Sequence, residues 1–152
     1  MKTMLLADTS QEKTYALIFD KDDEVIGELT AFARTRRISA AHFTAIGAFR
    51  EVTLAYFDPV GKRYRNIPVR EQVEVLSLVG DIALDGGEAK VHAHVVVGKA
   101  DATAHGGHLV AARVWPTLEL VLTESPRHLR RRSDAETGLA LIDLAAPEPP
   151  SV

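Results

Sequence analysis

Cysteine is absent from this 152-residue sequence, and the absence limits both its redox chemistry and its metal chemistry. Without thiols the chain forms no disulfide and no thiolate metal site, so any metal must rely on nitrogen and oxygen ligands. No apolar run approaches the roughly 18 residues that a membrane-spanning helix needs, and the apolar residues at the N-terminus soon give way to polar ones. We therefore expect a cytoplasmic protein with no membrane partner.

A strong net charge is also lacking. The formal charge of −3 provides no overall field that would attract nucleic acid. Two local clusters are basic, at Arg34–Arg37 and at Arg127–Arg132. The first suits the C-terminal end of a helix, and the second suits a solvated connection before the last strand. Contact with nucleic acid through the second cluster is the alternative.

Several familiar catalytic and nucleotide-binding motifs are missing as well. The sequence contains no G-x-S-x-G nucleophile motif, no G-x-x-x-x-G-K-[ST] loop and no G-x-G-x-x-G fingerprint. Hydrolysis by a serine triad and nucleotide binding by those routes are therefore unsupported. Metal-assisted water chemistry is the enzymatic option that remains.

The patterns that are present predict one domain built mainly of strands. The length, with 46% hydrophobic and 26% charged residues, is ordinary for a single soluble domain. One apolar stripe predicts a helix over about residues 23–37, capped by Asp22 or Asp23. We expect strands within residues 15–20, 42–58, 71–84, 88–98, 108–113, 117–124 and 134–144. The result is an α+β fold on a mainly antiparallel β-sheet with one principal helix.

Glycines mark the expected bends and turns of this sheet. Asp85–Gly87 predicts a hairpin, because glycine accepts positive φ at no steric cost. Gly47 predicts a bend, a bulge or a close backbone approach, so that residues 42–58 form either two strands or one bent strand. A loop is expected from Lys99 to Gly107.

Four of the six histidines lie close together, at His92, His94, His105 and His108. At a rise of about 3.3 Å per residue, His92 and His94 project from one face of a strand about 6.6 Å apart. The next strand can bring His108 to the same face, where three imidazoles would surround one point.

Three neutral nitrogens with an open fourth position suit zinc, although nickel, cobalt, iron and copper also accept imidazole. His105 could complete the site, act as a base beside it, or face solvent. The alternative for the whole group is a merely polar outer face of the sheet.

Glu119 is the carboxylate that could serve such a site. It alternates with Thr117 and Val121 along an expected strand, which allows it to act as a general base or to orient a metal ligand. It could equally be a strand-face charge paired with Arg113. The candidate catalytic residues are therefore Glu119 and His105.

Five motifs in fixed order carry a resemblance to a known family. They are AIGAF at Ala45–Phe49, VEVLSLVGDIAL at Val73–Leu84, VHAH at Val91–His94, GGHL at Gly106–Leu109 and TLELVL at Thr117–Leu122. In this order they resemble the PPC domain, the "plants and prokaryotes conserved" domain, in its stand-alone prokaryotic form. The resemblance covers about residues 14–144, which leaves an N-terminal segment at 1–13 and a tail at 145–152 that we expect to be disordered.

The resemblance implies an α+β fold assembled as a homotrimer. It also implies a bound metal, usually zinc, at the positions of His92, His94 and His108. Prokaryotic members often carry a DNA-binding label, to which the acidic balance of this chain lends little physical support. We expect a homotrimeric metal-binding protein with a binding or regulatory role. The alternative is a metal-dependent hydrolase or lyase that binds a small molecule near the metal.

Overall fold

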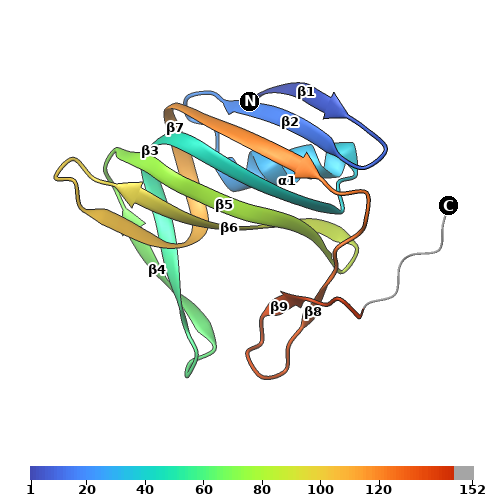
Figure 1. Ribbon diagram of the computed structural model, residues 1–152. Helices are drawn as coiled ribbons and strands as arrows, with labels where there is room; N and C mark the ends of the chain where they lie inside the picture. The colour runs from blue at the N-terminus through green and yellow to red at the C-terminus, as the bar shows by residue number, and fades with distance from the viewer. Residues whose placement is uncertain (146–152) are drawn as a thin grey trace.

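The protein folds around one curved antiparallel sheet with a helix against one face (Figure 1). The computed structural model describes residues 1–145. The elements in chain order are β1 (Lys2–Asp8), β2 (Lys13–Phe19), α1 (Val25–Arg36), β3 (Ala40–Asp58), β4 (Arg63–Val69), β5 (Val73–Asp85), β6 (Glu88–Gly98), β7 (Ala104–Glu124), β8 (Arg131–Ser133) and β9 (Ala140–Ile142). The main sheet has the strand order β1-β2-β7-β6-β5-β3-β4, and β8 pairs with β9 in a separate hairpin. The predicted α+β class with a mainly antiparallel sheet is confirmed.

The two longest strands, β3 and β7, bend the sheet and pair with each other over much of their length. The residues 42–58 form one bent strand rather than two, with shifts in register on either side of Gly47. A Cβ atom at Gly47 would collide with the Thr117 carbonyl oxygen and come within 2.8 Å of the Leu118 Cα atom. The close approach that this glycine predicted is therefore present.

Helix α1 occupies the predicted position, but its cap differs. Glu24, rather than Asp22 or Asp23, accepts hydrogen bonds from two backbone N–H groups of the first turn. The Asp22 carboxylate instead pairs with an arginine of β3, and the Asp23 carboxylate accepts the Asp20 backbone N–H. The apolar stripe of the helix is buried, and Leu29 has no exposed surface.

The turns around β6 determine where the histidines fall. Gly86 and Gly87, with φ of 61° and 91°, form the predicted turn of the β5–β6 hairpin. The loop predicted from Lys99 to Gly107 is shorter, because β7 begins at Ala104 and pairs at once with β6. His105 consequently lies in a strand and not in a loop, since cross-strand pairing overrides the weak strand propensity of the glycines that follow it.

The two ends of the chain join the structure in ways that the sequence pattern did not predict. Strand β1 pairs with β2 at the edge of the sheet, inside the segment 1–13. The strand predicted within 134–144 is the second arm of a small hairpin, and Arg131 and Arg132 belong to its first arm rather than to a solvated connection. Except for residue 145, the tail expected to be disordered lies outside the described residues.

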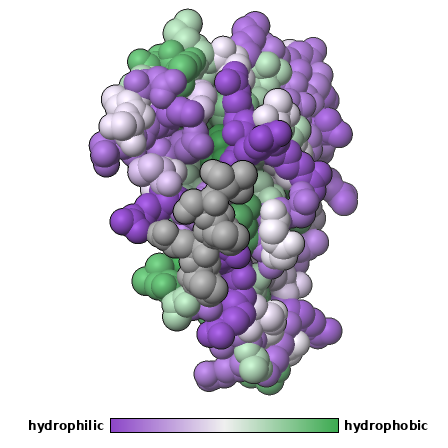
Figure 2. Space-filling view, turned by 90° about the vertical axis from the view of Figure 1, so that its right-hand side faces the viewer, coloured by the Kyte–Doolittle hydropathy of each residue, from purple (hydrophilic) through white to green (hydrophobic). Residues whose placement is uncertain are grey.

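The hydrophobic core lies between α1 and the sheet face that the helix covers. Its largest fully buried side chains include Phe19, Phe43, Phe49, Leu118, Leu120 and Leu122. The side of the molecule seen in Figure 2 is mainly hydrophilic, with smaller apolar patches. No helix among the described residues is long and apolar enough to cross a membrane.

The opposite face of the sheet carries apolar side chains that nothing in the described chain covers. We call this surface the open face, and its large exposed members are Ile46, Leu76, Val79 and Val121. A groove of about 570 Å³ runs along it.

Candidate metal centre

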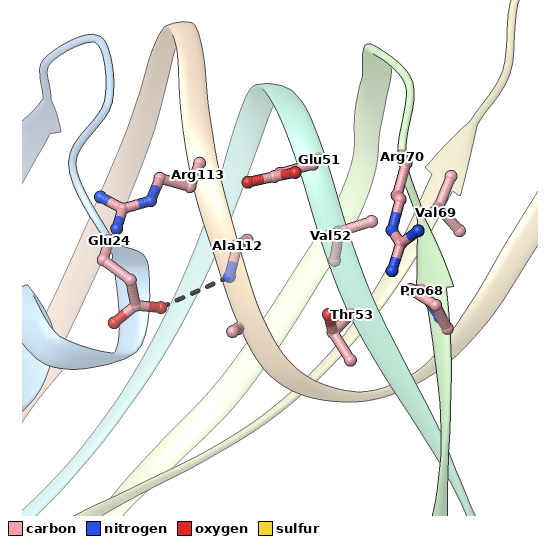
Figure 3. A pocket seen from close by; sticks show the side chains of 10 residues that line it. Glu24, Glu51, Val52, Thr53, Pro68, Val69, Arg70, Ala112 and Arg113 are labelled. Atoms are coloured by element: carbon pink, nitrogen blue, oxygen red, sulfur yellow. Dashed lines mark hydrogen bonds between the residues drawn. The ribbon is translucent and has the colours of Figure 1, made fainter.

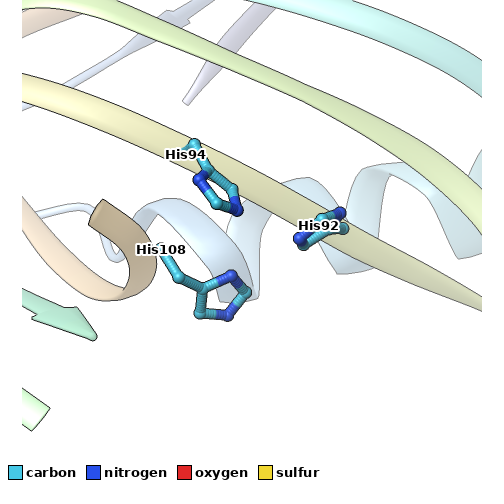
Figure 4. Close-up of side chains that lie close together, drawn as sticks. All are labelled: His92, His94 and His108. Carbon is cyan, nitrogen blue, oxygen red and sulfur yellow. The ribbon is translucent and has the colours of Figure 1, made fainter. Parts of the chain in front are cut away.

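Strand alternation brings three histidines together on the sheet face that points away from the helix. In β6, Ala93 and Val95 are buried in the core, so the side chains between and beside them project from the other face. His92 and His94 occupy two of these positions. The β6–β7 pairing places His108 directly opposite His94. Figure 4 shows the three rings approaching one another, two from β6 and one from β7.

The distances within this cluster suit a shared ion. The ring centroids of His92 and His94 lie 5.2 Å apart, those of His92 and His108 5.2 Å, and those of His94 and His108 5.5 Å. One nitrogen from each ring lies within 4.8 Å of the others. Zinc–nitrogen bonds of about 2.0–2.1 Å in a tetrahedral arrangement require nitrogens about 3.3 Å apart. Small rotations of the three side chains would close that difference.

Burial favours the neutral form that binds metals for two of these rings, His94 and His108. Burial, followed by the neighbouring charges of His92 and His94, lowers the pKa of His108 from 6.5 to about 4. Burial and His92 also lower the pKa of His94 below its ordinary value. At neutral pH both rings therefore offer a free lone pair, as a metal ligand must.

One nitrogen of the cluster lacks any hydrogen-bond partner within the protein. The Nδ1 atom of His108 is buried and unpaired in the described structure. Tyr64 of β4 stacks on the same ring, with centroids 4.7 Å apart and planes inclined by 27°. A buried polar atom without a partner is costly. The donor set and this unpaired atom fit an imidazole-bound divalent ion.

Two residues that contact the cluster or its neighbours, Asp81 and Arg131, were not foreseen from the sequence. The Nδ1 atom of His92 lies 3.5 Å from the Asp81 Oδ2 atom, and Arg131 donates a hydrogen bond to the Asp81 Oδ1 atom. The hairpin turn held the signal for Asp81. Because the turn pairs Asp85 with Glu88, counting outward along both strands pairs Asp81 with His92. Arg131 comes from a separate hairpin, so no local pattern indicated it.

The two residues considered as catalytic groups lie apart from the cluster. His105 pairs with Val97, an odd number of residues from His108 along a regular strand, and so projects from the opposite face. Glu119 lies next to Ile46 and borders the open face. From β6 the sheet passes through β5 and β3 before it reaches that part of β7, a span of about 14 Å at about 4.8 Å per strand. The structure brings neither residue to the three histidines.

A separate cavity of about 270 Å³ lies near the start of α1 (Figure 3). Glu24, Glu51, Arg70 and Arg113 give its lining charges of both signs. Glu24 serves structure here, because it caps the helix and accepts the Ala112 backbone N–H. In the described part of the chain, the group of side chains arranged to hold a metal is the histidine cluster rather than this cavity.

Comparison with solved structures finds close similarity over nearly the whole chain. A plant- and prokaryote-conserved (PPC) protein from Pyrococcus horikoshii is 30% identical with a TM-score of 0.84, covering 95% of this chain and 100% of that one. A metal-containing protein from Archaeoglobus fulgidus is 31% identical with a TM-score of 0.81, covering 91% and 99%. A protein from Bacteroides thetaiotaomicron, provisionally described as DNA-binding, is 27% identical with a TM-score of 0.83, covering 92% and 96%.

Sequence comparison agrees with the structural neighbours. No curated protein was found to match the chain. The family described as the Plants and Prokaryotes Conserved (PCC) domain matches residues 7–126, most of the sequence. The chain therefore belongs to the Plants and Prokaryotes Conserved domain family, also abbreviated PPC.

Proposed function

We propose that this protein binds a divalent metal ion, zinc in the first instance, through His92, His94 and His108, and that it has a binding or regulatory role. The observation that carries the proposal is the convergence of three imidazoles from two paired strands, with ligand atoms within 4.8 Å of one another. The unpaired Nδ1 atom of His108 and the metal-containing relative from Archaeoglobus fulgidus support it. The metals that accept imidazole include zinc, copper, iron and nickel.

Metal analysis of protein purified without an affinity tag tests this proposal. We expect close to one ion per chain in the wild type and loss of the ion in His92→Ala and in His108→Ala. His105→Ala is the matched control, because that residue lies on the same strand as His108 but projects from the other face. Wild-type protein that takes up no zinc, even after incubation with excess metal, would refute the proposal.

We also propose that the chain assembles as a homotrimer through its open face. The fractional exposures there are 61% for Ile46, 55% for Leu76, 49% for Val79 and 47% for Val121. A contiguous apolar surface of this kind on a folded protein usually marks an interface. Burying it against a second copy would remove those side chains from water, whereas an isolated chain leaves them exposed.

Light scattering coupled to size-exclusion chromatography measures this assembly. Val79→Glu should convert the trimer to smaller species, because it places a charge in the middle of the apolar surface. Val60→Glu is the matched control, since Val60 is 92% exposed in the turn between β3 and β4. A monomeric wild type, or a Val79→Glu variant that still forms trimers, contradicts the proposed interface.

The alternative function is a metal-dependent hydrolase or lyase that acts on a small molecule. The observation in its favour is that the cluster offers three candidate ligands among the described residues, the number that catalytic zinc sites use, whereas structural sites use four. A bound ion would supply Lewis acidity to a ligand in the remaining position. Glu119 and His105 lie apart from the cluster, and the carboxylate beside it is Asp81, whose Oδ2 atom is 3.5 Å from the His92 Nδ1 atom.

Cobalt substitution separates the two functions. If the fourth position exchanges its ligand, excess azide should shift the visible absorption bands of the cobalt-loaded protein. A spectrum that saturating azide leaves unchanged would indicate closed coordination and remove the enzymatic alternative. His105→Ala should respond like the wild type in either case.

A further inference from the structure

Asp81 stands where it can act on one of the three histidines and on no other. It lies in β5 directly opposite His92 in β6, and its Oδ2 atom is 3.5 Å from the His92 Nδ1 atom. Burial alone would raise the pKa of Asp81, but its interactions with His92 and Arg131 outweigh it and hold that pKa below its ordinary value. The shielded Arg131 guanidinium pairs with the same carboxylate, and a buried cation of this kind requires an anion as its partner.

The second oxygen of this carboxylate is held by a buried cation. Arg131 donates from Nη2 to the Asp81 Oδ1 atom, and its side chain is only 6% exposed. Burying a guanidinium is unfavourable unless a counter-ion accompanies it. Arg131 also donates from Nη1 to the Ala140 carbonyl oxygen at 3.0 Å, which ties the β8–β9 hairpin to this point.

The β5–β6 hairpin, which carries Asp81, also contains an ordinary ion pair for comparison. Asp85 pairs with Lys90 at 2.8 Å, with side-chain exposures of 36% and 53%. That pair has no histidine in contact and both partners remain in solvent, so we expect it to contribute little. Asp81 and Arg131 differ from it because they are largely shielded and connect a distant hairpin to the histidine cluster.

We propose that the Asp81–Arg131 pair is a positioning device that sets the tautomer of His92 and leaves its Nε2 atom free for the metal. A carboxylate can only accept a hydrogen bond, so it favours the proton on Nδ1 of the facing ring. Arg131 fixes which oxygen faces His92. The inference rests on the proposed metal site, but its first consequence, the tautomer, exists in the metal-free protein.

We expect the substitution Asp81→Asn to give His92 the opposite tautomer. Arg131 donates hydrogen bonds only, so it would retain the amide oxygen of the new side chain. The amide NH₂ group would then face His92 and donate to its Nδ1 atom. This forces the proton to Nε2 and blocks that atom as a ligand. The substitution thus reverses the tautomer while scarcely changing the volume of the side chain.

Two measurements test the proposal, with Asp85→Asn as the matched control in the same hairpin. Long-range ¹H–¹⁵N NMR spectra of the metal-free protein should show the Nδ1–H tautomer of His92 in the wild type and the Nε2–H tautomer in Asp81→Asn. Zinc affinity, measured by competition with a chromophoric chelator, should fall about 10–100-fold in Asp81→Asn. Asp85→Asn should match the wild type in both measurements.

Rescue by the conservative variant distinguishes positioning from simple destabilisation. Asp81→Glu restores a side chain that only accepts hydrogen bonds, so it should keep the wild-type tautomer and retain more zinc affinity than Asp81→Asn does. If Asp81→Asn does not fold, Arg131→Gln should give a smaller loss of affinity in the same direction.

The outcomes separate this inference from the proposed metal site. A wild type that binds no zinc overturns the metal site, and the tautomer measured without metal still decides the role of Asp81. Zinc binding by the wild type together with an unchanged tautomer and affinity in Asp81→Asn overturns the positioning role alone.

Discussion

Acid should destabilise the folded protein through His108, whether or not a metal is ever bound. Its pKa falls from 6.5 to about 4 in the folded chain, first because of burial and then because of His92 and His94. Between these two pH values, the His108 ring binds a proton in the unfolded chain but not in the folded chain. The folded state therefore loses stability as the pH falls from about 6.5 to about 4, and loses nothing through this group above that window.

The magnitude follows from the size of the pKa change. At about 1.36 kcal/mol per tenfold change in proton affinity, the full effect would be about 3.4 kcal/mol. The ring is only partly buried, so solvent screening reduces the expected effect to about 1–2 kcal/mol. Asp81 does not add to this effect in the same pH range. Its pKa is lowered in the folded chain, so its contribution to stability is lost only as the pH falls below its ordinary pKa of 3.8. His94 acts in the same direction and remains in the variant.

Urea unfolding of metal-free protein in a chelating buffer measures this effect. The fluorescence of Trp115, the sole tryptophan in the sequence, reports unfolding of wild type and His108→Gln at pH 7 and at about pH 4.5, at one fixed protein concentration. The wild type should lose about 1–2 kcal/mol more than the variant over this interval. The control His105→Gln should behave as the wild type does. Equal losses in wild type and His108→Gln would refute the reasoning.

Three further predictions test the metal, the backbone and the DNA-binding label. Zinc at about 100 times its dissociation constant should stabilise the wild type by about 2.7 kcal/mol in thermal unfolding and leave His92→Ala unchanged. Gly47→Ala should cost about 3 kcal/mol or more in urea unfolding, because its Cβ would strike the Thr117 carbonyl oxygen, whereas Gly138→Ala, also at positive φ but in open space, should cost about 1 kcal/mol. We expect the protein not to be retained on double-stranded DNA at about 50 mM salt, because its net charge is −3. In the basic cluster, moreover, Arg131 and Arg132 already pair with carboxylates. Salt-sensitive retention would contradict this expectation.

The parts of the fold that the sequence predicted are those determined by neighbouring residues. The β5–β6 hairpin follows from two adjacent glycines, and α1 follows from an apolar stripe at helical spacing. The start of β7 could not be read in this way. Residues 104–107 have weak strand propensity, and they form a strand because β6 offers an edge with which to pair.

The residues of the candidate site can also be separated into those that follow from neighbouring residues and those that depend on distant contacts. His92 and His94 belong to one strand, so their common face follows from a period of two residues. The face of His105 could be assigned only once β7 was known to begin before it. As part of that strand, His105 projects from the face opposite to that of His108. Asp81 could have been found from the hairpin register. Arg131 could not, because its contact with Asp81 joins residues 50 positions apart in separate sheets.

The glycines before His108 are best understood as a device that sets strand register. They resemble a loop in the sequence, yet Gly107 lies in β7 between β6 and β3, where a Cβ atom would approach the Ala55 carbonyl oxygen to 2.8 Å. At Gly106 a Cβ atom would lie 3.2 Å from the Val95 carbonyl oxygen. Both glycines thus let β7 enter a narrow space between two strands. A slip of one residue there would turn His108 toward the core, so the third imidazole depends on these contacts as much as on its own side chain.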